Sequence, residues 1–378
     1  MQDSLFEIRQ PLVNGSRVKQ ARELKGMTQA VLAESVYVDQ TMIAHIERGS
    51  RQPAGDQIEA ISQILELPLA FFRQHDCVEM PKGSLLFRSK AVVGKRVIAQ
   101  AYEQSRIELE FALGLGNYAS LIPVRIPQFN DPLEAAQELR RMMNLQAGPL
   151  TNLLRHVERL GVLILPLSDV RDCDAFATWA GPMRDIPIIG LASGRPADRM
   201  RMNTAHELGH LTLHRSFSFA SKENEQQAYQ FAAELLMPAS DIAEDFRREK
   251  VTIFRLAELK TKWNVSMQAI ARRARELQVI NDRQYRYLMM QISQKGWRCE
   301  EPTFTPNPLE KPRALRKLAE VAFGDQLDCT MIAKEFNLSS DFIYSTLSRC
   351  EAGVQSTLTL GNSTESDHKS PKLLAFRG

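Results

Sequence analysis

The sequence predicts a mainly helical α+β protein, and three features of its 378 residues point to that class. Apolar residues recur along most of the chain at the three- and four-residue spacings of amphipathic helices. Three short apolar runs, at 162–166, 175–179 and 186–191, are instead typical of strands and would form one small sheet. A helix with two histidines four residues apart follows that sheet, at 206–210.

The composition is typical of a soluble intracellular protein. Apolar residues make up 44% of the chain, which is enough for more than one core, and no run of about eighteen apolar residues predicts a membrane span. The five cysteines form no C-x-x-C pair, and the segment after Met1 has no signal-peptide pattern. We therefore expect a cytoplasmic protein with no membrane partner. The net charge of +3 is too small to indicate any partner.

Residues 1–75 are predicted to form a small domain of short helices. Thr28 is placed to cap the second helix. The apolar residues that would fill the core of this domain are Leu32, Ala33, Val38, Ile43 and Ile46. The stretch from Arg17-Val18-Lys19-Gln20 through Met27-Thr28-Gln29 to Ile46-Glu47-Arg48-Gly49 resembles the Xre-type helix-turn-helix of phage repressors. Tyr37 stands where that motif usually has a turn glycine, so we expect the turn to adopt another conformation.

This resemblance implies DNA binding through a recognition helix whose start faces the major groove. The candidate contact residues on or near that helix are Gln29, Asp39, Gln40, Thr41, Ala44 and His45. Residues 11–75 contain seven Lys or Arg and seven Asp or Glu, so they lack the basic excess of a tight DNA binder. Binding as a homodimer and docking to another protein are therefore alternatives for this domain.

The rest of the chain divides into four further parts. Residues 76–150 are interpreted as a helical connector, with a long helical segment near 93–120. Two helices are expected over 133–160, and residues 151–250 contain the three predicted strands and the histidine pair. Residues 251–350 are assigned to a helical C-terminal domain, in which 331–344 have helix, turn, helix spacing that fits packing or a second DNA contact. Residues 351–378 are rich in Ser, Thr and Gly and are predicted to be disordered.

The segment His206-Glu207-Leu208-Gly209-His210 is an H-E-x-x-H pattern within an apolar-flanked helix. Residues four apart on a helix differ by only about 40° in azimuth, so His206 and His210 project from one face. Two such imidazoles supply two of the three protein ligands of an open zinc site. Glu207 lies about 100° round the helix, where it can reach a water on the metal as general base. Because the pattern also arises by chance, the flanking sequence has to support it.

We expect the third ligand on the next predicted helix, over 225–237. Glu225 falls on the apolar face of that helix, and a carboxylate aimed at a core needs a partner such as zinc. Glu234 lies about 180° round the helix from Glu225 and is expected to face solvent. His214, four residues after His210, is the alternative ligand, although a histidine at a helix end also interacts with the helix dipole.

These segments together resemble the ImmA/IrrE family of zinc metallopeptidases. The matching residues are Arg199-x-Arg201, Thr204-Ala205-His206-Glu207-Leu208-Gly209-His210-Leu211, Glu225-x-x-Ala228 and Phe231-Ala232-Ala233-Glu234-Leu235-Leu236-Met237-Pro238. The resemblance implies a zincin-like domain over 151–250, with Zn²⁺ held by His206, His210 and Glu225 and with Glu207 as the base. Tyr229 departs from the family pattern, which has an Asp or Asn there to support the histidines.

We therefore expect a transcription regulator that binds DNA and also cleaves a protein with a zinc endopeptidase domain. The resemblance implies Xre-type repressors or antitoxins as substrates, in a stress, phage or mobile-element response. Tyr229 and Arg201 are candidates for stabilising the oxyanion. Two other interpretations are a catalytically silent transcription factor that uses the zincin fold as a sensor and an antitoxin-like binding module. The intact histidine pair and Glu207 argue against the silent form.

Overall fold

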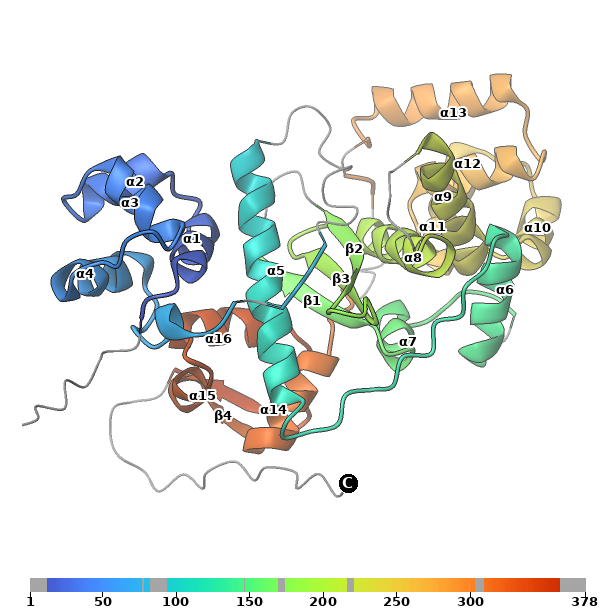
Figure 1. Cartoon of the computed structure of the whole chain (residues 1–378). Helices are drawn as coiled ribbons and strands as arrows, with labels where there is room; N and C mark the ends of the chain where they lie inside the picture. Colours follow the sequence, from blue (N-terminus) through green and yellow to red (C-terminus); the bar gives the residue numbers. More distant parts are fainter. Residues whose placement is uncertain are drawn as a thin grey trace, which may run out of the picture.

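The computed structural model describes residues 12–76, 78–81, 94–145, 147–168, 174–215, 221–298, 300–302 and 309–360 (Figure 1). Over these residues the protein is mainly helical with a three-stranded and a two-stranded sheet, which confirms the predicted α+β class. None of the helices in these ranges is both long and apolar enough to cross a membrane. The predicted disorder of residues 361–378 lies outside the described residues.

The N-terminal domain is a bundle of four helices and one 3₁₀ turn. These are α1 (Gly15–Leu24), α2 (Gln29–Ser35), α3 (Gln40–Glu47), α4 (Gly55–Leu65) and the turn Phe71–Arg73. The Thr28 hydroxyl accepts a hydrogen bond from the backbone N–H of Val31 (3.2 Å), so Thr28 caps α2 as predicted. The predicted core residues Leu32, Ala33, Ile43 and Ile46 are buried, and Val38 packs against them.

Tyr37 itself makes the turn between α2 and α3. Its φ is +55°, in the left-handed region, and the residue is 96% exposed. The expectation of another turn conformation is therefore wrong, because the tyrosine adopts the conformation that glycine usually takes. This geometry lets the N–H of Val38 reach the carbonyl of Ala33 (2.9 Å). The left-handed conformation costs a residue with a Cβ roughly 1–2 kcal/mol.

Tyr37→Gly is expected to stabilise the N-terminal domain by about 0.5–1 kcal/mol, because glycine takes this conformation without the Cβ clash. The greater freedom of glycine in the unfolded chain offsets part of the gain. Tyr37→Ala is the matched control, since it removes the same exposed ring but keeps the Cβ. Urea unfolding should show a higher midpoint for the glycine variant alone; equal midpoints for both variants would mean that this turn is not strained.

The main sheet lies at the centre of the chain and has the three predicted strands. These are β1 (Leu163–Leu167), β2 (Ala175–Ala180) and β3 (Ile186–Ala192). β3 is central, parallel to β1 and antiparallel to β2. A Cβ on Gly190 would lie 2.1 Å from the Phe176 ring on the neighbouring strand, so β3 needs glycine there. The helices that cover the sheet are α5 (Lys95–Leu115) and α14 (Ala314–Phe323) on one face and α8 (Ala197–Leu213) on the other (Figure 1).

Helices α6 to α13 form one core with the α8 side of the sheet. The other members are α6 (Pro132–Met142), α7 (Leu153–Arg159), α9 (Lys222–Leu236), α10 (Ala239–Arg248), α11 (Ile253–Trp263), α12 (Met267–Glu276) and α13 (Asp282–Gln294). α6 packs along α9, so this part of the predicted connector belongs to the core. A Cβ on Gly209 would lie 2.9 Å from the Phe231 ring and 3.2 Å from Ala228. Glycine at this position therefore lets α8 and α9 approach closely.

Residues 251–350 do not form one domain, in contrast to the prediction. α11 to α13 belong to the core of α8, whereas α14, α15 (Cys329–Phe336) and α16 (Ser340–Ser348) share a core with α5, β1 and the N-terminal domain. The helix pair expected over 331–344 is α15 and α16, and its inner face is used for packing. β4 (Gln326–Asp328) pairs with β5 (Thr357–Thr359), so the expectation of disorder is wrong for this part of the tail.

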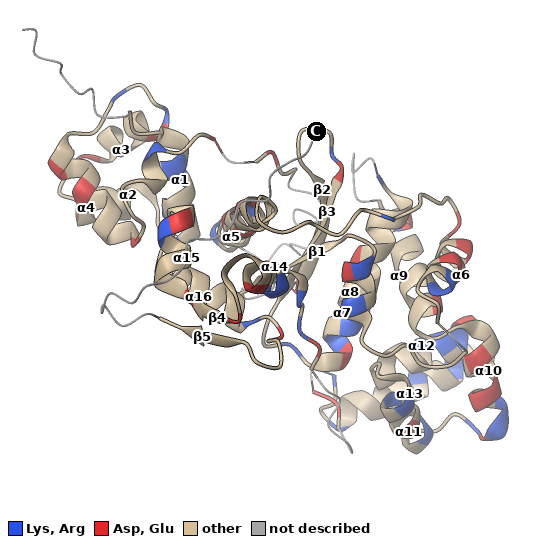
Figure 2. Cartoon of the chain, turned by 90° about the horizontal axis from the view of Figure 1, so that it is seen from below, with Lys and Arg blue, Asp and Glu red and all other residues tan. Residues whose placement is uncertain are grey.

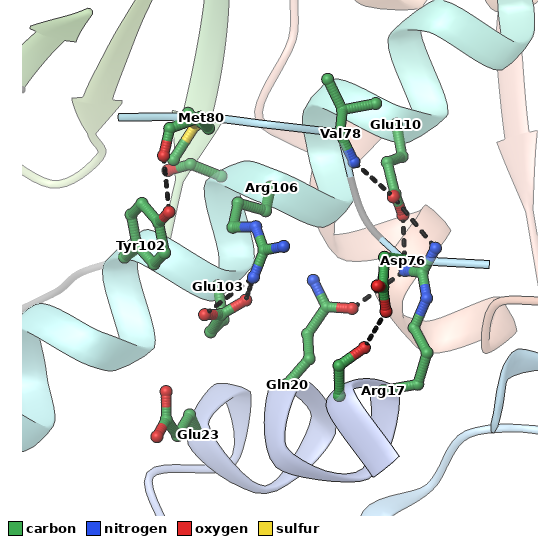
Figure 3. A network of polar contacts seen from close by, with 12 residues as sticks. Arg17, Gln20, Glu23, Asp76, Val78, Met80, Tyr102, Glu103, Arg106 and Glu110 are labelled. Carbon is green, nitrogen blue, oxygen red and sulfur yellow. Dashed lines mark hydrogen bonds and ion pairs between the residues drawn. The ribbon is translucent and has the colours of Figure 1, made fainter. Parts of the chain in front are cut away.

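A polar network joins α1 of the N-terminal domain to α5 (Figure 3). The Arg17 guanidinium donates to both carboxylate oxygens of Glu110, at 2.7 and 3.0 Å. On the same side of α5, Arg106 pairs with the buried Glu103 at 2.9 Å. Because a two-bond arginine–carboxylate contact fixes orientation as well as distance, it holds α1 in a defined orientation on α5.

Candidate metal centre

Two histidines of α8 meet at one point on the buried side of the helix. α8 follows Pro196 and continues to Leu213, which places His206 and His210 one turn apart. Both side chains are buried, and their Nε2 atoms are 3.1 Å apart. The helical spacing in the sequence therefore produces the expected pairing of the two rings.

Glu225 approaches both histidines from the first turn of α9. Ser221 caps this helix, because its hydroxyl accepts a hydrogen bond from the N–H of Asn224 (3.0 Å). The Glu225 carboxylate oxygens lie 3.3 Å from Nε2 of His206 and 3.2 Å from Nε2 of His210. The contact with His206, followed by that with His210, holds the pKa of Glu225 well below its usual range. The half-exposed carboxylate is therefore ionised at neutral pH.

His206, His210 and Glu225 form a triangle of ligand atoms, here called the ligand triangle. The separations are 3.1, 3.2 and 3.3 Å, and tetrahedral zinc ligands at about 2.0–2.1 Å from the metal lie about 3.3 Å apart. A carboxylate and the unprotonated nitrogen of a neutral imidazole both present lone pairs, so three such atoms at these separations are held together by a shared proton or a cation. Within the described ranges, these three side chains are the group whose geometry suits a metal ion.

His214, the alternative third ligand, lies behind His210. α8 ends at Leu213, and His214 follows as its C-cap, with its backbone N–H bonded to the His210 carbonyl (2.9 Å). The Nδ1 atom of His214 is 3.2 Å from Nδ1 of His210, whereas Glu225 contacts Nε2 of that ring. The Nε2 atom of His214 is 2.8 Å from Oε1 of Gln227. Burial lowers the pKa of His214, so its ring is neutral near pH 7.

Two predictions about charged residues near this site, Arg201 and Glu234, need correction. Arg201 is buried and engaged elsewhere, because it pairs with Glu310 and donates to the Leu150 carbonyl (2.6 Å). The expectation that Arg201 could stabilise an oxyanion is therefore wrong. Glu234 is buried rather than exposed, because Arg273 of α12 pairs with it from the far side of α9. Glu207 also lies on α8, and its side chain is fully buried.

A cavity of about 790 Å³ lies between α8, α9, α12 and α13, and none of the three residues of the ligand triangle lines it. It is lined by Tyr229, one turn after Glu225, and by Asn203, one turn before His206. The Arg272 guanidinium lies over the Tyr229 ring, 3.2 Å from its centre. Burial raises the pKa of Tyr229 to about 12, so its hydroxyl stays protonated and can donate a hydrogen bond. The sequence did not indicate the cavity residues of α12 and α13 because only the fold brings these helices beside α9.

The candidate DNA-contact residues lie on α3 and around it. The exposed ones are Asp39, Gln40, Thr41 and His45, and Ala44 is half-buried. Gln29 differs, because its side-chain amide donates to Glu47 (2.8 Å), which also pairs with Arg22 (2.5 Å). Glu47 is the one Asp, Glu, Lys or Arg on α3. By contrast, α1 carries three basic residues and one acidic residue, and α4 carries two acidic residues (Figure 2). The outer surface of α3 therefore suits hydrogen bonds more than attraction by net charge.

A compact helix-turn-helix bundle and a histidine-bearing helix beside a small sheet define a two-domain class, a helix-turn-helix protein with a zincin-like domain. Comparison with protein families agrees with both parts. Residues 157–275 match the IrrE N-terminal-like domain of peptidase family M78, and residues 18–72 match the helix-turn-helix family. The chain thus joins an Xre-like helix-turn-helix domain to an IrrE N-terminal-like domain.

Two curated relatives resemble the N-terminal part of the chain. They are uncharacterized HTH-type transcriptional regulators of Sinorhizobium medicae (strain WSM419) and of Rhizobium meliloti (strain 1021), the latter named R00410. Each is 36% identical over 58 residues, which is 15% of this chain and 42% of the relative. Among solved structures, Bacillus thuringiensis PlcR in complex with the peptide PapR7 and DNA matches at 13% identity over 74% of this chain and 92% of its own. Its TM-score of 0.16 is too low to support any conclusion.

Proposed function

We propose that this protein is a DNA-binding transcription regulator of the cytoplasm whose IrrE-like domain is a zinc-dependent endopeptidase. The observation that carries the peptidase is the ligand triangle, in which two imidazole nitrogens and a carboxylate stand at the mutual distances of tetrahedral zinc ligands. Three protein ligands leave one position open, which is the arrangement of catalytic rather than structural zinc. The expected substrate is a protein of the Xre-type repressor or antitoxin class.

The chemistry divides between the ion and the protein. Zinc, when bound, would polarise the scissile carbonyl and make a water more acidic. Glu207 would take a proton from that water and pass it to the leaving amine. Tyr229 is the remaining candidate for a donor to the developing oxyanion, because it is protonated and lies one helical turn after Glu225 on α9. In the N-terminal domain, α3 would present Asp39, Gln40, Thr41, Ala44 and His45 to DNA, and Gln29 would orient Glu47 as well as approach the groove edge.

The metal content of the purified protein tests this proposal. We expect one zinc per chain in the wild type and in Glu207→Gln, and no stoichiometric zinc in Glu225→Ala, because two ligands cannot hold the ion as tightly as three. Elemental analysis of the three proteins, purified side by side, gives the answer. If the wild type contains no zinc, the peptidase assignment is overturned and the helix-turn-helix regulator remains as the proposed function. If Glu225→Ala keeps its zinc, the ligand assignment is overturned.

A further inference from the structure

We propose that Gln227 and His214 form a hydrogen-bonded chain that orients His210 for the metal. The chain has two links: Oε1 of Gln227 is 2.8 Å from Nε2 of His214, and Nδ1 of His214 is 3.2 Å from Nδ1 of His210. His210 then presents its other nitrogen, Nε2, to Glu225 and His206. This inference rests on the proposed zinc site and assigns positioning roles to two residues outside it.

The chemistry of the groups allows one direction for the protons. An amide oxygen only accepts, so the Gln227 contact fixes the proton of neutral His214 on Nε2 and leaves a lone pair on Nδ1. That lone pair faces Nδ1 of His210, which must therefore carry a proton and donate it. The Nε2 lone pair of neutral His210 is then directed at the ligand triangle. With the opposite tautomer of His210, two lone pairs would face each other across 3.2 Å.

The local structure at the end of α8 explains how Gln227, His214 and His210 come into line. α8 ends at Leu213, and the next residue, His214, has a non-helical φ of −127° and ψ of 68°. The imidazole rings of His210 and His214 lie 5.4 Å apart between centres. Gln227 lies on α9 two residues after Glu225, so the helix that supplies the carboxylate also supplies the amide. One crossing of α8 and α9, at Gly209, therefore sets both the ligand triangle and its support.

This arrangement accounts for the departure at position 229. The resemblance predicts an Asp or Asn there to support the histidines, whereas Tyr229 lies beneath Arg272 and lines the cavity. Metal-binding histidines nearly always donate their second ring N–H to a partner that sets the tautomer and orientation. Here the partner of His210 is a second imidazole, itself fixed by an amide.

The first test measures zinc affinity by competition with a chromophoric chelator. Loss of an outer partner typically lowers metal affinity 10–100-fold. We expect a loss in that range for His214→Phe and a smaller loss for Gln227→Met, whereas Gln227→Glu should keep or raise the affinity because a carboxylate also accepts from Nε2 of His214. Gln226→Met, at the exposed neighbouring position, is the matched control and should bind zinc as the wild type does. Wild-type affinity in both Gln227→Met and His214→Phe would overturn the proposal.

The second test does not depend on zinc. In protein labelled with ¹⁵N-histidine and kept metal-free at pH 8, the ring nitrogen shifts should show neutral His214 with its proton on Nε2. Gln227→Met should convert His214 to a mixture of tautomers, while Gln226→Met leaves it unchanged. A proton on Nδ1 of His214 in the wild type would contradict the proposed hydrogen-bonded chain directly. If the tautomer is as expected and the wild type binds no zinc, the proposed peptidase fails and the hydrogen-bonded chain stands as a feature of the apoprotein.

Discussion

Glu207→Gln is expected to keep one zinc per chain and to lower peptide hydrolysis by about a hundredfold to ten-thousandfold, the range typical of a lost general base. Glu207 is not part of the ligand triangle, so the metal should be unaffected. Glutamine has the same shape as glutamate but cannot take up the proton of the attacking water. The fully buried position of Glu207 also means that an amide of equal size should preserve the packing of α8.

Because the substrate is a proposal, the measurement should not depend on knowing it. New protein N-termini can be compared by mass spectrometry between cells that express the wild type and cells that express Glu207→Gln. Cleavage sites that appear with the wild type alone identify substrates, which can then be assayed with purified proteins. Glu223→Gln, an exposed change in the first turn of α9, is the control and should cleave as the wild type does. Equal cleavage by Glu207→Gln would assign the base to another residue.

The parts of the site that local geometry determines were predictable from the sequence. His206 and His210 are brought together by the repeat of one helix, and Glu225 was indicated because a carboxylate stood on an otherwise apolar helix face. Both arguments use distances of a few residues along the chain. The three strands were equally predictable, because each is a short apolar run and all three are buried in the fold.

The errors arise where a partner distant in the sequence changes the outcome. Glu234 was expected to face solvent from its position on α9, but Arg273 lies 39 residues away and makes burial possible. Arg201 was a candidate for catalysis until Glu310, 109 residues away, accounted for it. Helical periodicity identifies the outward direction of a side chain, but it does not reveal that another helix covers that face. The cavity residues on α12 and α13 were missed for the same reason.

The Glu234–Arg273 pair should be among the most sensitive points of the fold. Arg273→Met is expected to destabilise the protein by about 3–5 kcal/mol, the usual cost of leaving one member of a buried ion pair without its partner. Both side chains are 5% exposed, so water cannot replace the lost contact. The Arg273 guanidinium also donates to the Met237 carbonyl (3.2 Å), where α9 ends. A thermal midpoint lowered by roughly 10 °C is therefore the expected result.

The double variant Glu234→Met/Arg273→Met separates the charge effect from packing. It removes both charges and fills similar volume, so it should recover most of the lost stability, because replacing a whole buried pair with apolar side chains is often neutral or better. Arg141→Met is the control for an exposed pair: Arg141 is 74% exposed in its contact with Glu138, and the change should cost less than about 1 kcal/mol. If the double variant is as unstable as Arg273→Met, the pair is needed for its hydrogen bonds to the end of α9 rather than for charge balance. In that case the bonds from Arg273 to the Met237 carbonyl and from the Ala239 N–H to Glu234 are what the fold needs after α9.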